Sequence, residues 1–261
     1  GTGGVLNRVT KKAQLDQGFT TSQLSVDSLG ELGGQIDHNR VISDSVALRI
    51  NAMVERLDNH RDFYDGDRVG VNPTLHIESG DSVIDLSYEY IDHQRFIDRG
   101  IPTGADGRPV EAFEEIVFGD PDVNTTALKA HLWRASVQHS FSDTLKGNIA
   151  AFYGDYDKLY QNFYVAAYDQ AQTPDEVTLD GYVDTTQRQN SILSANLVGE
   201  SEFAGTQHTL LAGVEFIDTS SDQDRWNTFW DTTDDDKETF SLTRNLGLEG
   251  GIGLNALGNV A

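Results

Sequence analysis

Residues 46–56 read VALRINAMVER, a segment in which apolar and polar side chains alternate. Successive side chains of an extended chain point to opposite sides, so this segment has one apolar side and one mainly polar side. The apolar side carries Leu48, Ile50, Ala52 and Val54, and the other carries Arg49, Asn51, Met53 and Glu55. Alternation of this kind predicts a β-strand that separates two different environments.

The same alternation recurs along the chain, in VIDLSYEY at 83–90, WRASVQHSF at 133–141 and TLLAGVEF at 209–216. No helical stripe of comparable quality is present, and 25 Gly against 5 Pro favours an all-β chain over a helical bundle. The pattern predicts about nine strands of roughly ten residues or more, longer than is usual in soluble proteins and suited to transmembrane strands. Their expected ranges are 17–27, 31–42, 46–57, 68–77, 82–95, 127–141, 144–160, 187–203 and 207–219.

The connections between these strands alternate in length. Short turns are expected at 43–45, 78–81, 142–144 and 204–206, and longer polar connections at 57–67, 96–126, 161–186 and from about 220 onward. A transmembrane β-barrel has short periplasmic turns at one end and longer extracellular loops at the other. The alternation therefore favours a barrel in the outer membrane, although a secreted β-sandwich that binds a ligand stays open as an alternative.

Charge and composition narrow the function. The chain has 42 Asp and Glu against 19 Lys and Arg, a net charge of -23, which argues against nucleic acid as a partner. Much of this acid lies in segments expected to be loops, such as DTTDDD at 231–236. There is no Cys, so a disulfide framework or a thiolate metal site is excluded, and the seven His show no metal-ligand spacing. Neither a Gly-rich phosphate-binding loop after a strand nor a nucleophile elbow of the G-x-S-x-G type is found.

Several segments resemble one known family in their order and spacing. They are GGVLNRVTKK at 3–12, RVGVNPTL at 68–75, YEY at 88–90 followed by DRGIP at 98–102, FGDP at 118–121, and HTLLAGVE at 208–215. The first resembles the last strand of the plug domain of TonB-dependent receptors. The others resemble barrel strands and an outer loop of the siderophore-receptor branch of that family.

The resemblance implies that residues 1–12 are the C-terminal end of a plug domain and residues 13–261 the N-terminal portion of a receptor barrel. The fold would be all-β, an antiparallel meander within a 22-stranded barrel in the cell outer membrane, and the chain would be an incomplete piece of it. Its implied partners are a ferric siderophore, the TonB-ExbB-ExbD energising complex and outer-membrane lipid. Iron enters only within the bound siderophore, and no cofactor is expected. The resemblance implies energy-coupled import in which no bond of the ligand is made or broken, so we expect a transporter and not an enzyme. Cobalamin, haem or an oligosaccharide stays open as an alternative cargo.

Side chains near the outer ends of the strands, and in the loops beyond, are candidates for contact with such a cargo. Aromatic rings and a few cations suit a bulky, partly apolar and often anionic iron chelate. The candidate substrate-binding residues are His93, Arg95, Tyr156, Tyr160, Phe163, Trp226 and Trp230. The alternative for the loop aromatics is that they pack on one another. Arg8 is the candidate plug–barrel contact, expected to face Glu55 or Glu89.

Overall fold

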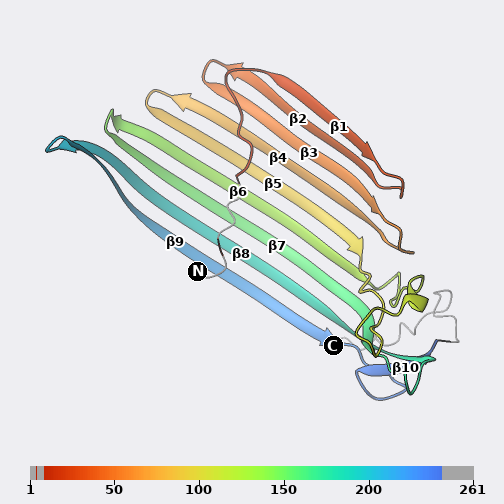
Figure 1. The fold of residues 1–261 in the computed structure, drawn as a ribbon. Helices are drawn as coiled ribbons and strands as arrows, with labels where there is room; N and C mark the ends of the chain where they lie inside the picture. Colours follow the sequence, from red (N-terminus) through yellow and green to blue (C-terminus); the bar gives the residue numbers. More distant parts are fainter. Residues whose placement is uncertain (1–3, 5–8, 243–261) are drawn as a thin grey trace.

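The computed structural model describes Gly4 and residues 9–242, and most of these residues belong to one antiparallel sheet (Figure 1). Each strand up to β8 pairs with the next along the chain, and both β9 and β10 pair with β8. A single 3-10 turn, η1 (Glu111–Phe113), lies between β5 and β6. The strands are β1 (Phe19–Val26), β2 (Leu32–Ser43), β3 (Val46–Asp58), β4 (Asp65–Ser79), β5 (Ser82–Phe96), β6 (Thr125–Ser142), β7 (Leu145–Ala167), β8 (Glu176–Phe203), β9 (Thr206–Asn227) and β10 (Lys237–Ser241).

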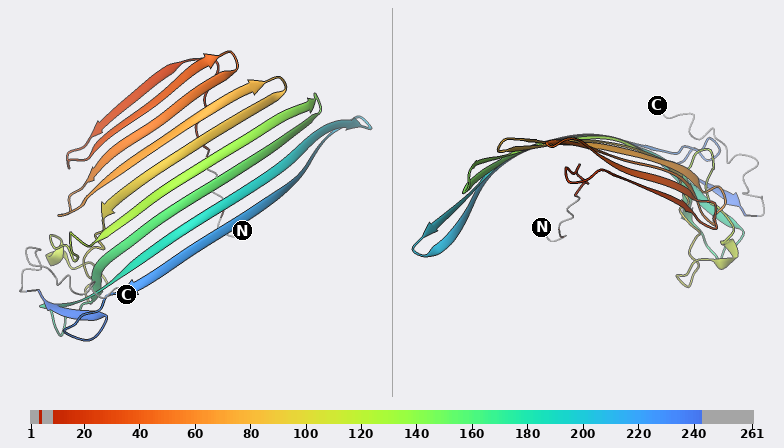
Figure 2. Two further views of the ribbon diagram at one scale, coloured as in Figure 1. Left: turned by 180° about the vertical axis from the view of Figure 1, so that it is seen from behind. Right: turned by 90° about the horizontal axis from the view of Figure 1, so that it is seen from above.

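The sheet is curved, and the segment that precedes β1 lies on its concave side (Figure 2). Paired residues of antiparallel strands point to the same face, so the register assigns every strand residue to one side. Leu48 of β3, Leu75 of β4 and Leu86 of β5 follow one another across the sheet on the convex face. Asn51 and Asn72 are paired on the concave face. The alternation read from the sequence is therefore the separation of an apolar convex face from a polar concave face.

A row of aromatic rings crosses the convex face. Tyr88 of β5 lies beside Trp133 of β6, which in turn lies beside Tyr153 of β7, with ring centroids 5.2 Å and 5.6 Å apart. Beyond this row, toward the end of the sheet that carries the longer loops, the convex face becomes polar, with Asp92 and Asp157 in place of apolar residues. A band of apolar residues bordered by aromatic rings is typical of a strand surface that faces lipid.

The predicted nine strands are all present in one sheet, and a sandwich with two facing sheets is not what the described residues form. Two predicted loops were wrong. Most of 161–186 is strand, because β7 continues to Ala167 and β8 begins at Glu176, and the loop expected from about 220 begins only after Asn227. The predicted strands also missed β10. The physical reason is burial: Val177 and Leu179 alternate with polar residues and are buried by loops far away in the sequence.

These loops form a small packed unit at one end of the sheet. We call residues 97–124, 168–175 and 228–242 the cap. One cluster joins Phe118 of the cap to Val177 and Leu179 of β8, and another joins Val123, Phe163 and Trp230. The cap therefore shares a hydrophobic core with the tip of the β7–β8 hairpin. Over the part of the chain that is described, no helix has the length and apolar character required to cross a bilayer.

Candidate ligand-binding site

Three tyrosines form a platform on the concave face, at the cap end of β7 and β8. Tyr160 and Tyr164 point to the same face of β7, two pleat repeats apart. Tyr182 of β8 is paired with Asn162 and so lies between them. The Tyr160 and Tyr182 rings are stacked, with centroids 5.9 Å apart and planes inclined by 17°. Tyr164 meets Tyr182 edge to face at 6.0 Å. Long strands position this platform, because only their extension beyond β6 brings these three rings onto one surface.

Two arginines lie on the tyrosine platform. The Arg99 guanidinium carbon lies 4.6 Å from the Tyr164 ring centroid, and Arg225 Cζ of β9 lies 4.5 Å from the Tyr182 centroid. Arg99 Nη1 also donates hydrogen bonds to the Tyr182 hydroxyl at 3.0 Å and to Asn162 Oδ1 at 3.2 Å. A cation over an aromatic face is attracted by the ring quadrupole, so each contact fixes both partners.

Carboxylates fix the remaining polar groups of the platform. Asp184 accepts from Nε and Nη2 of Arg225, both at 2.5 Å, which is the bidentate arrangement that restricts a guanidinium most strongly. The Tyr164 hydroxyl donates to Asp180 at 3.1 Å. Among the described residues, Arg99 has no carboxylate partner. Arg99 therefore presents positive charge to the concave side, and Arg225 is largely neutralised.

Further cations share this end of the concave face. They are Arg68 of β4 and Arg95 of β5, with Lys158 and Arg188 extending the set across β7 and β8. His93 lies opposite Arg68 and is not counted among these cations. Of these, Arg68 is paired with Glu55 at 2.9 Å. In a chain with a net charge of -23, this is a concentration of positive charge against the overall balance. A concave surface with aromatic rings and surplus cations suits an anionic aromatic ligand.

The structure divides the sequence-predicted residues into three groups. His93, Arg95, Tyr156 and Tyr160 lie on the concave face. Trp226 is paired with Val183 and lies on the opposite face from Arg225. Phe163 and Trp230 are buried, with 0% and 5% exposure, and pack on each other at a ring distance of 5.5 Å. Contact of any of these residues with a cargo stays a prediction.

Sequence reasoning missed most of the residues that complete the platform. Tyr182 fell within a predicted loop, so no face was assigned to it, and Arg99 and Arg225 were not singled out. One signal was present: residues 176–183, EVTLDGYV, alternate as a strand does. The position of Arg99 has no local signal, because a loop residue reaches the sheet only through tertiary folding.

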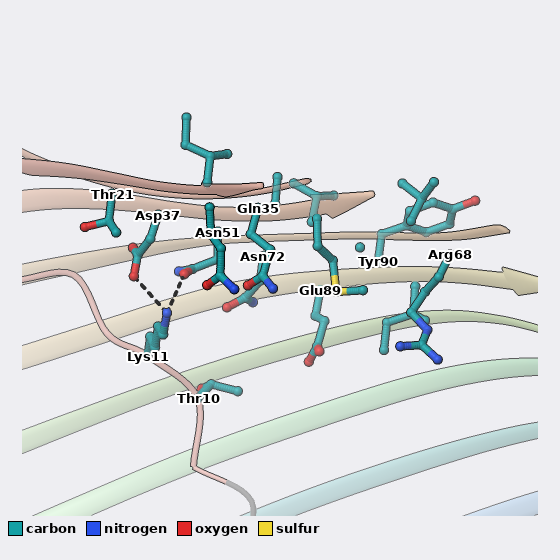
Figure 3. Close-up of a pocket in the computed structure, with 18 of the residues that line it drawn as sticks. Thr10, Lys11, Thr21, Gln35, Asp37, Asn51, Arg68, Asn72, Glu89 and Tyr90 are labelled. Carbon is teal, nitrogen blue, oxygen red and sulfur yellow. Dashed lines mark hydrogen bonds and ion pairs between the residues drawn. The ribbon is translucent and has the colours of Figure 1, made fainter. Parts of the chain in front are cut away.

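The segment before β1 is attached to the concave face by ion pairs and hydrogen bonds. We call residues 9–17 the strap. Lys11 Nζ lies 2.8 Å from Asp37 and 3.2 Å from Asn51, as Figure 3 shows, and Lys12 Nζ lies 2.6 Å from Asp85. Between the strap and β1–β5 lies a cavity of about 570 Å³, whose lining includes apolar residues such as Val71 as well as Gln35 and Glu89. The strap thus crosses the polar face without filling it.

Asn39 of β2 holds the backbone of the strap. Its side chain is 1% exposed, accepts from Gln14 N at 2.9 Å, and donates to the carbonyls of Gln14 and Gln17 at 2.9 and 2.6 Å. Beside it, Arg49 forms a bidentate pair with Asp37 at 2.7 Å and donates to the Lys12 carbonyl. Buried amides that are fully satisfied in this way specify one arrangement of the chain.

The expected contact of Arg8 lies outside the described residues. Of its two expected partners, Glu55 pairs with Arg68, and Glu89 pairs with Arg134 at 3.1 Å. Lys11 and Lys12 instead make the described ion pairs between the strap and the sheet. Within the described residues, no group of three or more His, Asp or Glu side chains is arranged to hold a metal ion.

Comparisons with known proteins give this geometry a context. The chain is 25% identical over 227 residues to the metal-pseudopaline receptor CntO of Pseudomonas aeruginosa, covering 82% of this chain and 30% of CntO. It is 33% identical over 102 residues to the catecholate siderophore receptor Fiu of Escherichia coli, covering 38% of this chain and 13% of Fiu. It is 32% identical over 105 residues to the probable TonB-dependent receptor BfrD of Bordetella pertussis, covering 39% of this chain and 14% of BfrD. The chain is thus similar to part of several TonB-dependent receptors.

Solved structures of siderophore receptors share the fold. The receptor PiuA of Acinetobacter baumannii matches with a TM-score of 0.79 at 16% identity, covering 89% of this chain and 36% of PiuA. The pyoverdine outer membrane receptor FpvA of Pseudomonas aeruginosa matches with a TM-score of 0.75 at 14% identity, covering 87% of this chain and 33% of FpvA. No family model matches the chain. The chain thus spans about a third of the length of these receptors or less. The 22 strands expected for the complete barrel of this protein stay a prediction.

Proposed function

We propose that this chain is part of an outer-membrane receptor for the TonB-dependent uptake of ferric siderophores. The observation that carries the proposal is the tyrosine platform with Arg99, which lies on the concave face at the end of the sheet that bears the cap. The relatives that are named receptors for siderophores or metal chelates support it. No bond of the cargo is made or broken in this function.

The platform favours one class of siderophore. A ferric catecholate is aromatic, bulky and negatively charged, so its rings can stack on Tyr160 and Tyr182 while its charge faces Arg99. The Arg99 N–H groups that make no hydrogen bond within the described chain are available to oxygen atoms of such a chelate. A cationic or neutral hydroxamate complex would gain less from the same surface.

The strap is the part of this chain that would couple cargo uptake to the energising complex. Residues 1–12 would be the end of the plug domain, and the energising complex TonB-ExbB-ExbD would act on the plug upstream of them. The ion pairs of Lys11 and Lys12, with the clamp by Asn39, support a fixed connection between plug and barrel at this point. When TonB pulls on the plug, the strap and the start of β1 would then stay attached to the barrel.

The binding test uses the full-length receptor purified in detergent. The iron(III) complex of 2,3-dihydroxybenzoate is titrated by tryptophan fluorescence quenching, with the iron(III) complex of desferrioxamine B, haem and cobalamin as comparison ligands. We expect Arg99→Ala to weaken binding of the catecholate complex about 10- to 100-fold, because a hydrogen bond to a charged group contributes about 1.5–3 kcal/mol.

Arg108→Ala is the matched control, since Arg108 is an exposed arginine of the same loop whose side chain makes no hydrogen bond among the described residues. Its affinity should equal that of the wild type. Binding of haem or cobalamin in place of both ferric complexes, or of none of the four ligands, would overturn the proposed function.

A further inference from the structure

We propose that Arg61, in the β3–β4 loop, is a positioning residue that holds Arg99 on the tyrosine platform by fixing the carboxylate of Asp98. This inference rests on the proposed function, because it names a residue that controls the binding site without touching the cargo. Arg61 makes no hydrogen bond or ring contact to Tyr160, Tyr164 or Tyr182 within the described residues.

Arg61 links two loops that are far apart in the sequence. Its Nε lies 2.5 Å from Asp98 Oδ2, its Nη2 donates to the Ile116 carbonyl at 2.8 Å, and its Nη1 donates to the Glu114 carbonyl. The two charged side chains are only 17% and 10% exposed. A guanidinium has a planar fork of donors, and here the fork closes on three acceptors of a single loop. The start and the middle of the cap loop 97–124 are therefore fixed to one point.

Asp98 uses its other oxygen to shape the backbone on both sides of Arg99. Asp98 Oδ1 accepts from Gly100 N at 2.8 Å, which closes a turn with Arg99 at its centre. Gly100 has a φ of +82°, a conformation that glycine adopts without the strain that a side chain would cause. One carboxylate thus receives Arg61 on one oxygen and the turn on the other. The conformation of the residue that carries the binding cation follows from the position of Arg61.

Arg99, which follows Asp98 in the chain, contacts the tyrosine platform. Arg99 lies over Tyr164 and donates to Tyr182 and Asn162 from Nη1 alone, so its side chain is already ordered in the absence of cargo. Ordering a long side chain before binding removes an entropy cost from association. Without Arg61, the nearly buried Asp98 carboxylate would lose its cation, and the loop would rearrange to expose it to water. The Arg99 side chain would then lose conformational entropy each time the cargo binds, and the affinity would fall.

A double-mutant cycle in the full-length receptor tests this inference. The titrated ligand is again the iron(III) complex of 2,3-dihydroxybenzoate, and the proteins are the wild type, Arg61→Ala, Arg99→Ala and the double variant. We expect Arg61→Ala alone to weaken binding about tenfold, and to cause no further loss when Arg99 is already alanine. Equal losses in the two backgrounds, or no loss from Arg61→Ala in the wild type, would overturn the inference while leaving the proposed function intact if Arg99→Ala still weakens binding.

A readout apart from affinity separates positioning from a general loss of structure. Hydrogen exchange of the Gly100 amide should become faster in Arg61→Ala, because the Asp98 acceptor is no longer held. Asp98→Asn retains a carbonyl oxygen for Gly100 but loses the charge that pairs with Arg61, so its loss of affinity should be smaller than that of Arg61→Ala. Unchanged exchange at Gly100 in Arg61→Ala would contradict the role given to Asp98.

Discussion

At the scale of single residues, buried side chains with several partners fix how distant segments meet. Asn39 holds the strap, and Arg61 holds the cap loop, each through three acceptors or donors that lie in one other segment. Burying such a polar side chain lowers the free energy of unfolding little while all its hydrogen bonds are made. Removing one partner lowers it much more, because the remaining polar groups stay buried without a partner. A few polar side chains on or near the concave face therefore determine where the strap and the cap loop are held.

Asn39→Ala is expected to release the strap. The three hydrogen bonds to Gln14 and Gln17 would be lost, weakening strap docking by about 1–3 kcal/mol. Trypsin cleavage after Lys11 and Lys12, followed by mass spectrometry of the full-length receptor, measures this docking. Asn190→Ala is the control, since Asn190 makes no side-chain hydrogen bond in the described structure. An unchanged cleavage rate in Asn39→Ala would contradict the clamp.

At the scale of the strand, register and length decide what each face contacts. The outward residues of β7 run from Leu145 through Ile149 to Tyr153, and Ile149 is 56% exposed at the middle of this apolar run. Beyond Tyr153 the same face carries Asp155 and Asp157. The strand thus passes from an apolar surface to a polar one at a ring-bearing residue, as a strand that leaves the lipid would.

Ile149→Arg and Asn148→Arg form a pair of neighbouring substitutions on opposite faces. A charged side chain at the middle of the lipid-facing band costs about 2–4 kcal/mol, whereas a concave-facing position tolerates it. We expect Ile149→Arg to lower the yield of folded receptor in the outer membrane, and Asn148→Arg to leave it near the wild-type level. The heat-modifiable mobility of the folded barrel on gels measures the yield. Equal yields would mean that the convex face does not meet lipid at this level.

At the scale of the whole molecule, the chain has two stabilising systems. The sheet depends on continuous strand pairing and exposes an apolar convex face, while the cap shares a core with the ends of β7 and β8 around Phe118, Phe163 and Trp230. The cap meets the ends of β7 and β8 and, through Arg61, the β3–β4 loop, but it does not cover the middle of the strands, so we expect it to open without the sheet unfolding.

Trp230→Ala is expected to loosen the cap and leave the barrel folded. Removing a buried Trp that packs on Phe163 and Phe240 costs about 3–5 kcal/mol through lost contacts and the cavity left behind. Hydrogen exchange over residues 97–124 should rise, while the thermal unfolding of the barrel stays unchanged. Phe229→Ala, at an exposed neighbouring position, is the control. Loss of the barrel transition in Trp230→Ala would contradict the independence of the cap.

The sequence by itself determined the all-β class and the meander of nine long strands, because period-two alternation is a local property of an extended chain. Only the tertiary structure decided that β7 and β8 extend past their apolar runs, since cap residues from elsewhere bury Val177 and Leu179. The same is true of Arg99 and its support by Arg61: loop residues have no periodicity, and their positions follow from contacts between segments that the order of residues does not reveal.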